Sequence, residues 1–228
     1  MNSEQLALVR GWDDTRATLR VWQRRPLPVV GAWAAASFVV AVLLLLATWV
    51  VAVFTVPDPA VFSHTGTGEW DDFAFILYRN GLVLALHAMA CVAGFMAGSS
   101  LPIVAEGYSG LWRRMHDKAG KLAMGFVGLA TLFSLTTQGY ALGMTASSLA
   151  DASGVSPALL LLSLLPHAIP ELTALFLPLA AWLLASRRGA WDELLAATFV
   201  TVAVAIPVVI GAAAVEVYLS PHVLSFLK

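Results

Sequence analysis

Charged residues and cysteines are scarce in this sequence. Only 12% of its 228 residues are Asp, Glu, Lys or Arg, whereas 59% are hydrophobic, and the mean hydropathy is +0.81. A soluble globular domain carries about twice this share of charged residues, so that class is excluded. Cys91 is the only cysteine. It has no partner for an intrachain disulfide, and we interpret it as a small buried thiol.

Two further absences bear on function. The formal net charge is -1, so the chain lacks the surplus of Lys and Arg that a nucleic-acid-binding surface requires. The motifs GxSxG and HExxH are absent, as is a glycine-rich phosphate loop followed by Lys and Ser or Thr. We therefore expect a protein that is not an enzyme, that uses no cofactor and binds no nucleic acid. An ATP-driven function would need another subunit.

The hydrophobic residues are gathered into five long runs. A helix needs about 20 apolar residues to cross the hydrocarbon core of a bilayer, and each run is long enough. We therefore predict an all-α fold, a polytopic membrane helix bundle of five transmembrane helices. The first run is too long for the hydrophobic region of a cleaved signal peptide, so we expect it in the mature protein. The predicted spans are Val29–Phe54, Phe75–Val104, Leu122–Leu149, Pro157–Ala185 and Leu194–Leu219.

Lys and Arg alternate between the segments that join these runs. The segment before the first run has five, the connection between runs two and three has four, and Arg187 and Arg188 follow run four. The other two connections have none. This positive-inside pattern predicts a multi-pass protein of the cell membrane with a cytoplasmic N-terminus and an outside C-terminus. Arg79 lies within a span, and we expect it to snorkel to the outer interface.

Residues 1–27 are predicted to form a cytoplasmic amphipathic segment, and residues 28–228 the transmembrane bundle. Before the first run, apolar residues recur at roughly helical spacing, with charged residues between them. This pattern favours a helix that lies on the membrane surface; a helix that binds a partner protein is the alternative. The apolar residues are Leu6, Val9, Trp12, Leu19 and Trp22.

Glu171 is the most informative residue, because about fifteen or more uncharged residues lie on either side of it. A carboxylate at mid-bilayer costs roughly 2.5 to 3.5 kcal/mol and usually faces the protein interior or a wet cavity. His167 would share a face with it on a continuous helix. Proline removes a backbone donor, so we expect a break in the helix near this carboxyl group. The prolines of this span are Pro166, Pro170 and Pro178.

Three interpretations of Glu171 remain open. We favour a link to a neighbouring helix; the others are a proton or ion pathway and a metal centre. A catalytic zinc site needs three protein ligands, and His87 and Glu216 are the other candidates by type. Glu216 also fits a solvated helix end, and His87 fits an ordinary packing residue. We assign no catalytic residue and no metal ligand. The intramembrane polar residues that we single out are Asn80, Gln138, His167, Glu171 and Glu216.

Glycines four residues apart predict close contact between helices. Gly94 and Gly98 form such a step in the second run, and Gly139 and Gly143 form one in the third. Small residues at this spacing let helix backbones approach each other in lipid. Together with Pro170, these glycines are the predicted helix-packing residues.

Several of these segments together resemble the stage II sporulation protein M family. His-Ala-Ile-Pro-Glu-Leu at residues 167–172 is similar to its His-Gly-Ile-x-Glu element, and residues 213–221 are similar to its closing Ala-x-x-Glu-x-x-x-Thr-Pro segment. Residues 138–143 resemble its Asn-Gly-x-x-x-Gly step, and Asn80 with the later glycines resembles a further span. Ala168, Gln138 and Ser220 depart from the family's Gly, Asn and Thr.

The resemblance covers roughly residues 75–221 and implies a multi-helix membrane protein that works in the cell envelope. In the sporulation case such a protein assembles with peptidoglycan-degrading partners, although the family extends to organisms that do not sporulate. We therefore predict a non-enzymatic scaffold that contacts the lipid bilayer, other membrane or envelope proteins and, in a homo-oligomer, its own copies. The alternative is a transporter or permease subunit in which an intramembrane glutamate binds protons or cations.

Overall fold

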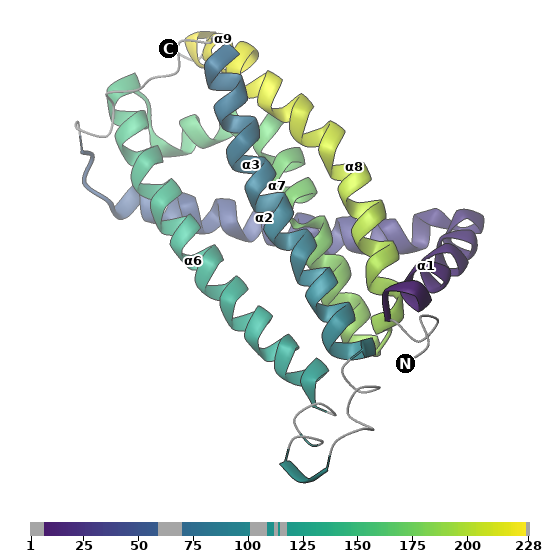
Figure 1. The fold of residues 1–228 in the computed structure, drawn as a ribbon. Coiled ribbons are helices and arrows are strands. Elements are labelled where there is room, and N and C mark those ends of the chain that lie inside the picture. The colour runs from purple at the N-terminus through teal and green to yellow at the C-terminus, as the bar shows by residue number, and fades with distance from the viewer. Residues whose placement is uncertain (1–6, 59–69, 101–108, 112–113, 115–117, 227–228) are drawn as a thin grey trace.

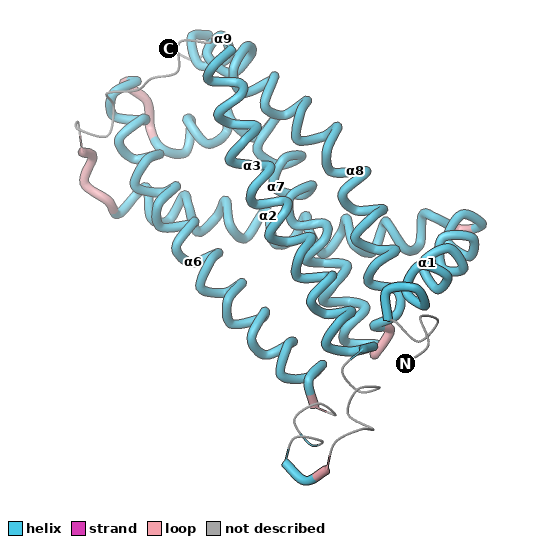
Figure 2. Tube along the Cα trace, viewed as in Figure 1, coloured by secondary structure: helices cyan, strands magenta, loops and turns pink. Residues whose placement is uncertain are grey.

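The protein is helical throughout the part of the chain that the structure describes. The structure, a computed structural model, describes residues 7–58, 70–100, 109–111, 114 and 118–226. Within these ranges every regular element is a helix, and Figure 2 shows helices in cyan joined by short loops. The predicted all-α class is confirmed.

Helix α1 (Ala7–Arg24) precedes a bundle of five long helices (Figure 1). Two of the long helices continue into a wider π turn, η3 and η5, and a short 3-10 turn, η4, precedes the last long helix. The elements after α1 are α2 (Pro26–Phe54), α3 (Trp70–Phe95), η3 (Met96–Ser100), α6 (Ala119–Ser153), α7 (Pro157–Arg188), η4 (Trp191–Glu193), α8 (Leu194–Ala214), η5 (Val215–Leu219) and α9 (Ser220–Phe226).

Four segments of the described chain are long and apolar enough to cross a membrane: Pro26–Phe54, Trp70–Gly98, Pro157–Arg188 and Trp191–Leu219. They coincide with four of the five predicted spans. The remaining predicted span forms α6, whose crossing of the membrane stays a prediction. The predicted end of the second span, Val104, lies outside the described residues.

Consecutive long helices alternate in direction. The end of α2 lies beside the end of α6, because the Ser147 hydroxyl donates to the Thr55 carbonyl at 2.8 Å and the Asp58 amide donates to the Ser148 hydroxyl at 2.9 Å. These two helices therefore run in the same direction. Helix α3 runs opposite to α8, since Phe73 in its first turn stacks against Tyr218 of η5 at 6.4 Å between ring centroids.

Helix α7 is the centre of the bundle. In its most apolar stretch 56% of the residues are buried, against 28–33% in the other three candidate spans, and it contacts α2, α3, α6 and α8. The outer helices keep one apolar face exposed, as expected for helices that face lipid. Polar side chains on α7 are therefore the ones that the bundle shelters best.

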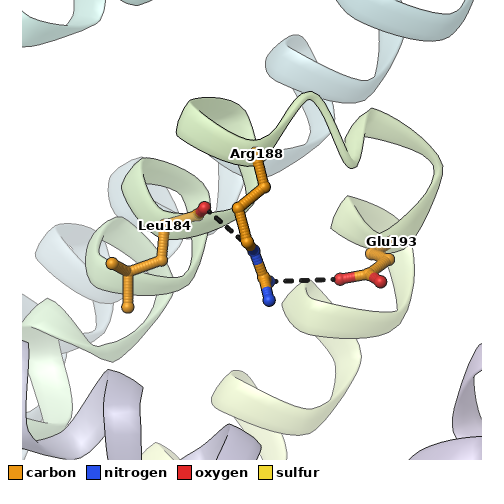
Figure 3. A network of polar contacts seen from close by, with 3 residues as sticks. All are labelled: Leu184, Arg188 and Glu193. Atoms are coloured by element: carbon orange, nitrogen blue, oxygen red, sulfur yellow. Dashed lines mark hydrogen bonds and ion pairs between the residues drawn. The ribbon is translucent and has the colours of Figure 1, made fainter.

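The ends of α7 follow from its flanking residues. The Ser156 hydroxyl accepts the Leu159 amide and Pro157 occupies the first turn, which is a favoured helix start. Gly189 ends the helix with a φ of 72°, a left-handed conformation that suits glycine. Figure 3 shows Arg188 at this end, donating to the Leu184 carbonyl at 3.2 Å and pairing with Glu193 at 3.4 Å.

Three of the four singled-out glycines lie where neighbouring helices meet most closely. A Cβ on Gly94 would lie 2.5 Å from the indole nitrogen of the buried Trp182, and one on Gly143 would lie 2.5 Å from Val51 Cβ. Gly98 lies against the ring of Trp191. A Cβ on Gly139 would make only ordinary contacts of 3.5 Å, so this position does not require glycine for space.

The expected break in α7 is wrong. The helix runs from Pro157 to Arg188 without interruption, although Pro166, Pro170 and Pro178 lie inside it. Each proline removes only one amide donor, so most hydrogen bonds of the helix remain. Packing against four helices therefore outweighs the local cost of the prolines.

Candidate functional site

A polar cluster joins α3, α7 and η5. The Asn80 side chain of α3 interacts with the Glu171 carboxyl group of α7, and that carboxyl group has a like-charge interaction with Glu216 of η5. Glu216 in turn interacts with Arg79, the residue before Asn80. We call these four residues the acid cluster. Asn80, Glu171 and Glu216 are half-buried, and Arg79 is exposed.

The acid cluster contains two carboxyl groups and one guanidinium. Glu171 gains a neutral donor, Asn80, while Glu216 is the acid that interacts with Arg79. The second Glu171 oxygen, Oε2, is buried without a hydrogen-bond partner. A buried acceptor left unpaired costs about 1–3 kcal/mol. This oxygen therefore either destabilises the bundle or is a site that can bind a proton.

For Arg79 the sequence predicts only a position at the outer interface. It is exposed, its guanidinium carbon lies 5.7 Å from the centre of the Phe75 ring, and it interacts with Glu216. One sequence feature does indicate that Arg79 belongs to the site: it lies next to Asn80, in the same helical turn. A basic residue inside a span usually has a partner of opposite charge, and Glu216 is an acid near the same end of the apolar runs.

His167 lies in a second, adjacent contact. Its Nδ1 atom lies 3.0 Å from the Ser220 hydroxyl at the start of α9, and the exposed fractions are 6% for His167 and 9% for Ser220. The Ser220 hydroxyl also donates to the Val215 carbonyl at 3.2 Å. The hydroxyl has one proton, so His167 Nδ1 is the donor whenever that proton is on the Val215 carbonyl. His167 thus pairs with Ser220, whereas Glu171 pairs with Asn80.

The π turn η5 makes this arrangement possible. It inserts one residue into the helical repeat between Val215 and Leu219, which lets Ser220 reach back five residues to the Val215 carbonyl. The same turn carries Glu216 toward Glu171. Such turns are frequent at functional sites, and here one brings residues of the family-like closing segment to α7.

Two residues of α3 bond directly to the backbone of α7. The His87 ring nitrogen Nδ1 lies 2.7 Å from the Leu175 carbonyl, and the Cys91 thiol donates to the Pro178 carbonyl at 3.0 Å. A carbonyl oxygen has two lone pairs, so each of these carbonyls can accept a side-chain donor from α3 besides its bond within the helix. With Asn80, these residues form a line of contacts from α3 to α7.

Gln138 lies apart from this site. Its amide nitrogen donates to the Ser134 hydroxyl at 2.8 Å within α6. Among the described residues, no group of three or more His, Cys, Asp and Glu side chains is placed to hold a metal ion. The structure therefore brings together Asn80, Glu171 and Glu216, sets His167 beside them with Ser220, and leaves Gln138 outside.

Two apolar grooves lie on other parts of the bundle. One, of about 440 Å³, lies between α2 and α6, and one of about 420 Å³ lies between α2 and α7. Neither is lined by a residue of the acid cluster. Trp49 of α2 and Ile169 of α7 are among the residues that line the second groove.

Comparison with known proteins agrees with the resemblance stated above. The sequence model of the family described as Stage II sporulation protein M matches residues 118–221. This stretch is slightly less than half of the chain and contains residues 138–143, 167–172 and 213–221, whereas Asn80, Gly94 and Gly98 precede it. The resemblance is confirmed over that stretch. No curated protein and no solved structure matches the chain.

Proposed function

We propose that this protein is a non-enzymatic membrane component that holds partner proteins of the cell envelope in place. The carrying observation is the set of hydrogen bonds that the central helix α7 receives from α3, through His87 and Cys91, and from the start of α9, through Ser220. Hydrogen bonds between membrane helices fix their rotation and register, because the alternative is an unpaired polar group in hydrocarbon. A bundle fixed in this way presents an unchanging outer surface to other proteins.

The topology that accompanies this proposal has five spans. Helix α6 runs in the same direction as α2, and together with α7 it completes an alternating series. Lys118, Lys121, Arg187 and Arg188 then lie at the end of the bundle where α2 begins, which supports a cytoplasmic N-terminus and an outside C-terminus. The acid cluster accordingly lies toward the outer half of the membrane.

The partners are other membrane or envelope proteins, and homo-oligomers are included. Support comes from the family match at residues 118–221, because the resemblance to that family implies assembly with envelope partners. Support also comes from the apolar faces that α2, α3 and α6 leave exposed. The cluster contributes by keeping these faces in a fixed arrangement.

One observation favours a second function, a carrier for protons or cations. Glu171 Oε2 is buried and has no hydrogen-bond partner, and a second carboxyl group, Glu216, interacts with it. Neighbouring acids within the membrane are a feature of proton relays in transporters. The two functions differ in what they require of Glu171: a hydrogen bond for the scaffold, and a titrating group for the carrier.

Glu171→Gln separates them, because glutamine can still form a hydrogen bond with Asn80 but cannot bind a proton. In proteoliposomes with a pH-sensitive dye inside, the scaffold predicts no proton or cation flux for the wild type. In cells, a photo-crosslinking residue at the exposed Trp49 should give the same adducts for wild type and Glu171→Gln, and fewer for Glu171→Leu. Flux through the wild type that Glu171→Gln abolishes would replace the scaffold by the carrier.

A further inference from the structure

Helix α1 is fixed to the bundle by one face. Gly11 packs so closely that an added Cβ would lie 2.7 Å from Phe95 and 2.8 Å from Leu195. Thr15 is 6% exposed, and Trp22 meets Trp33 of α2 edge to face at 5.1 Å. Gly11, Thr15 and Trp22 are separated by four and seven residues, so they form one stripe on the helix.

The depth of α1 follows from the residues it touches. Phe95 is in the last turn of the candidate span Trp70–Gly98, and Leu195 is in the first turns of the span Trp191–Leu219. A third candidate span, Pro26–Phe54, also contacts α1 and begins only one residue after α1 ends. The helix therefore lies beside the ends of three membrane helices, at the level where phospholipid headgroups begin.

Three arginines point away from the packed face. Arg16, Arg20 and Arg24 are exposed and follow one another at four-residue intervals. At 100° per residue this row lies on the side of the helix opposite Gly11, Thr15 and Trp22. We call it the arginine row.

The residues around the arginine row suit a membrane boundary. Trp12 is 59% exposed and Val21 is 67% exposed, one on each side of the row. The Arg16 guanidinium carbon lies 5.2 Å from the centre of the Trp12 ring. Asp13 and Asp14 are exposed too, so with Arg25 the exposed side has four arginines and two aspartates. The surplus is positive, and tryptophan prefers the headgroup region of a bilayer.

We propose that the arginine row binds the phosphate groups of anionic phospholipids in the leaflet next to α1. Guanidinium groups bind phosphate oxygens in pairs, and three of them spaced about 6 Å along a helix face match neighbouring headgroups. An acidic protein segment would satisfy the charge, but it would not account for the depth of the row or for the apolar Trp12 and Val21 beside it. This surface does not depend on the scaffold function.

The test uses the full chain, purified in a neutral detergent and titrated with phosphatidylglycerol or with phosphatidylcholine of the same acyl chains. Native mass spectrometry gives the apparent Kd for each lipid. Each basic residue near a membrane surface changes anionic binding roughly fivefold, so replacing all three arginines with glutamine should reduce the preference for phosphatidylglycerol about 100-fold. The variant with three lysines instead should keep most of the preference, because it keeps the charge.

A matched control removes three other exposed basic residues at the same end of the bundle: Lys118→Gln, Lys121→Gln and Arg187→Gln. It carries the same change in net charge and should keep the preference for phosphatidylglycerol within about fivefold. Inorganic phosphate should compete poorly, since it lacks the acyl chains that hold a lipid at this depth.

Three outcomes would overturn the proposal. The first is an unchanged lipid preference in the triple glutamine variant, and the second is an equal loss in the control. The third is tighter binding of a soluble polyglutamate peptide to the protein in phosphatidylcholine nanodiscs, with no displacement by phosphatidylglycerol, which would assign the row to an acidic protein. Circular dichroism and gel filtration of each variant, with the lysine variant as reference, separate lost binding from lost folding.

Discussion

Replacing Gly143 with alanine should destabilise the bundle, whereas the same change at Gly139 should not. The two glycines lie one turn apart on α6, and both face α2. A Cβ at position 143 would lie 2.5 Å from Val51 Cβ and 2.9 Å from the Thr48 carbonyl oxygen. A Cβ at position 139 would lie 3.5 Å from both Ala47 and Leu44. The pair therefore differs in contact distance and in little else.

The atoms that Gly143→Ala would meet have no freedom to move alone. One is a branch point attached to the main chain of α2, and the other belongs to the main chain itself. To restore an ordinary carbon–carbon separation of about 3.5 Å, the two helices must separate by roughly 1 Å. A gap of this size forfeits a quarter to a half of the attraction of each contact along the seam.

The expected magnitude combines two opposing effects. Overpacking a tight site costs about 1–3 kcal/mol, whereas alanine in place of glycine in a helix gains about 0.8–1 kcal/mol. Gly143→Ala should therefore lose up to about 2 kcal/mol in the free energy of unfolding. Gly139→Ala should gain up to about 1 kcal/mol, because it has the helix benefit without the clash.

Thermal unfolding in one detergent, followed by far-UV circular dichroism, measures both variants against the wild type. About 1 kcal/mol corresponds to roughly 2–4 °C for a chain of this length, so the two melting temperatures should differ by several degrees with opposite signs. Equal melting temperatures for the two variants would show that α2 and α6 do not meet at Gly143 as described. A loss in both would point to a general need for small residues on this face.

Three other changes test the polar contacts. Ser220→Ala should lower the melting temperature by the equivalent of about 1–3 kcal/mol, because it leaves the buried His167 without its partner, while Ser220→Thr should keep most of the stability; equal melting temperatures for alanine and threonine would contradict the bond. Arg79→Gln and Glu216→Gln should each destabilise the bundle, and the double variant should lose less than the two together by about 0.2–1 kcal/mol, because Arg79 is exposed and solvent screens its charge, as a double-mutant cycle in detergent measures; strict additivity would mean that the two charges do not interact. Cys91 has no exposed surface, so N-ethylmaleimide should label it only as fast as the protein unfolds, and mass spectrometry of the folded protein should show an unmodified thiol; rapid labelling of the native protein would place this thiol elsewhere.

The sequence predicts the helices of this protein better than their rotation. Apolar runs mark each long helix, since a helix that crosses hydrocarbon needs about 20 consecutive, mostly apolar residues, and such a run can be found in the sequence alone. The spacing of Gly139 and Gly143 indicated a close helix contact but not that only Gly143 meets a backbone atom. That distinction depends on how α2 is rotated, and each residue along a helix turns the contact face by about 100°.

The partners of the polar residues show the same limit. His167 and Glu171 were expected to share a face, and one turn apart on an unbroken helix they lie about 40° apart around the axis. That angle is enough to direct one toward Ser220 and the other toward Asn80. Which neighbour each meets is decided by α3 and α9, which approach α7 from different sides. Local spacing on α7 carries no information about either.

The π turn η5 separates two residues of the closing segment that a regular helix would place on one face. From the sequence, Glu216 and Ser220 are four residues apart and would lie on one face of a regular helix. The inserted residue in η5 widens the turn, so that Ser220 bonds the Val215 carbonyl five residues back and His167, while Glu216 interacts with Glu171 and Arg79. Nothing in the composition of Val-Glu-Val-Tyr-Leu distinguishes a π turn from an α turn. The wider turn persists because the contacts with α3 and α7 compensate for its cost, so the chemistry of this site is a property of the packed bundle.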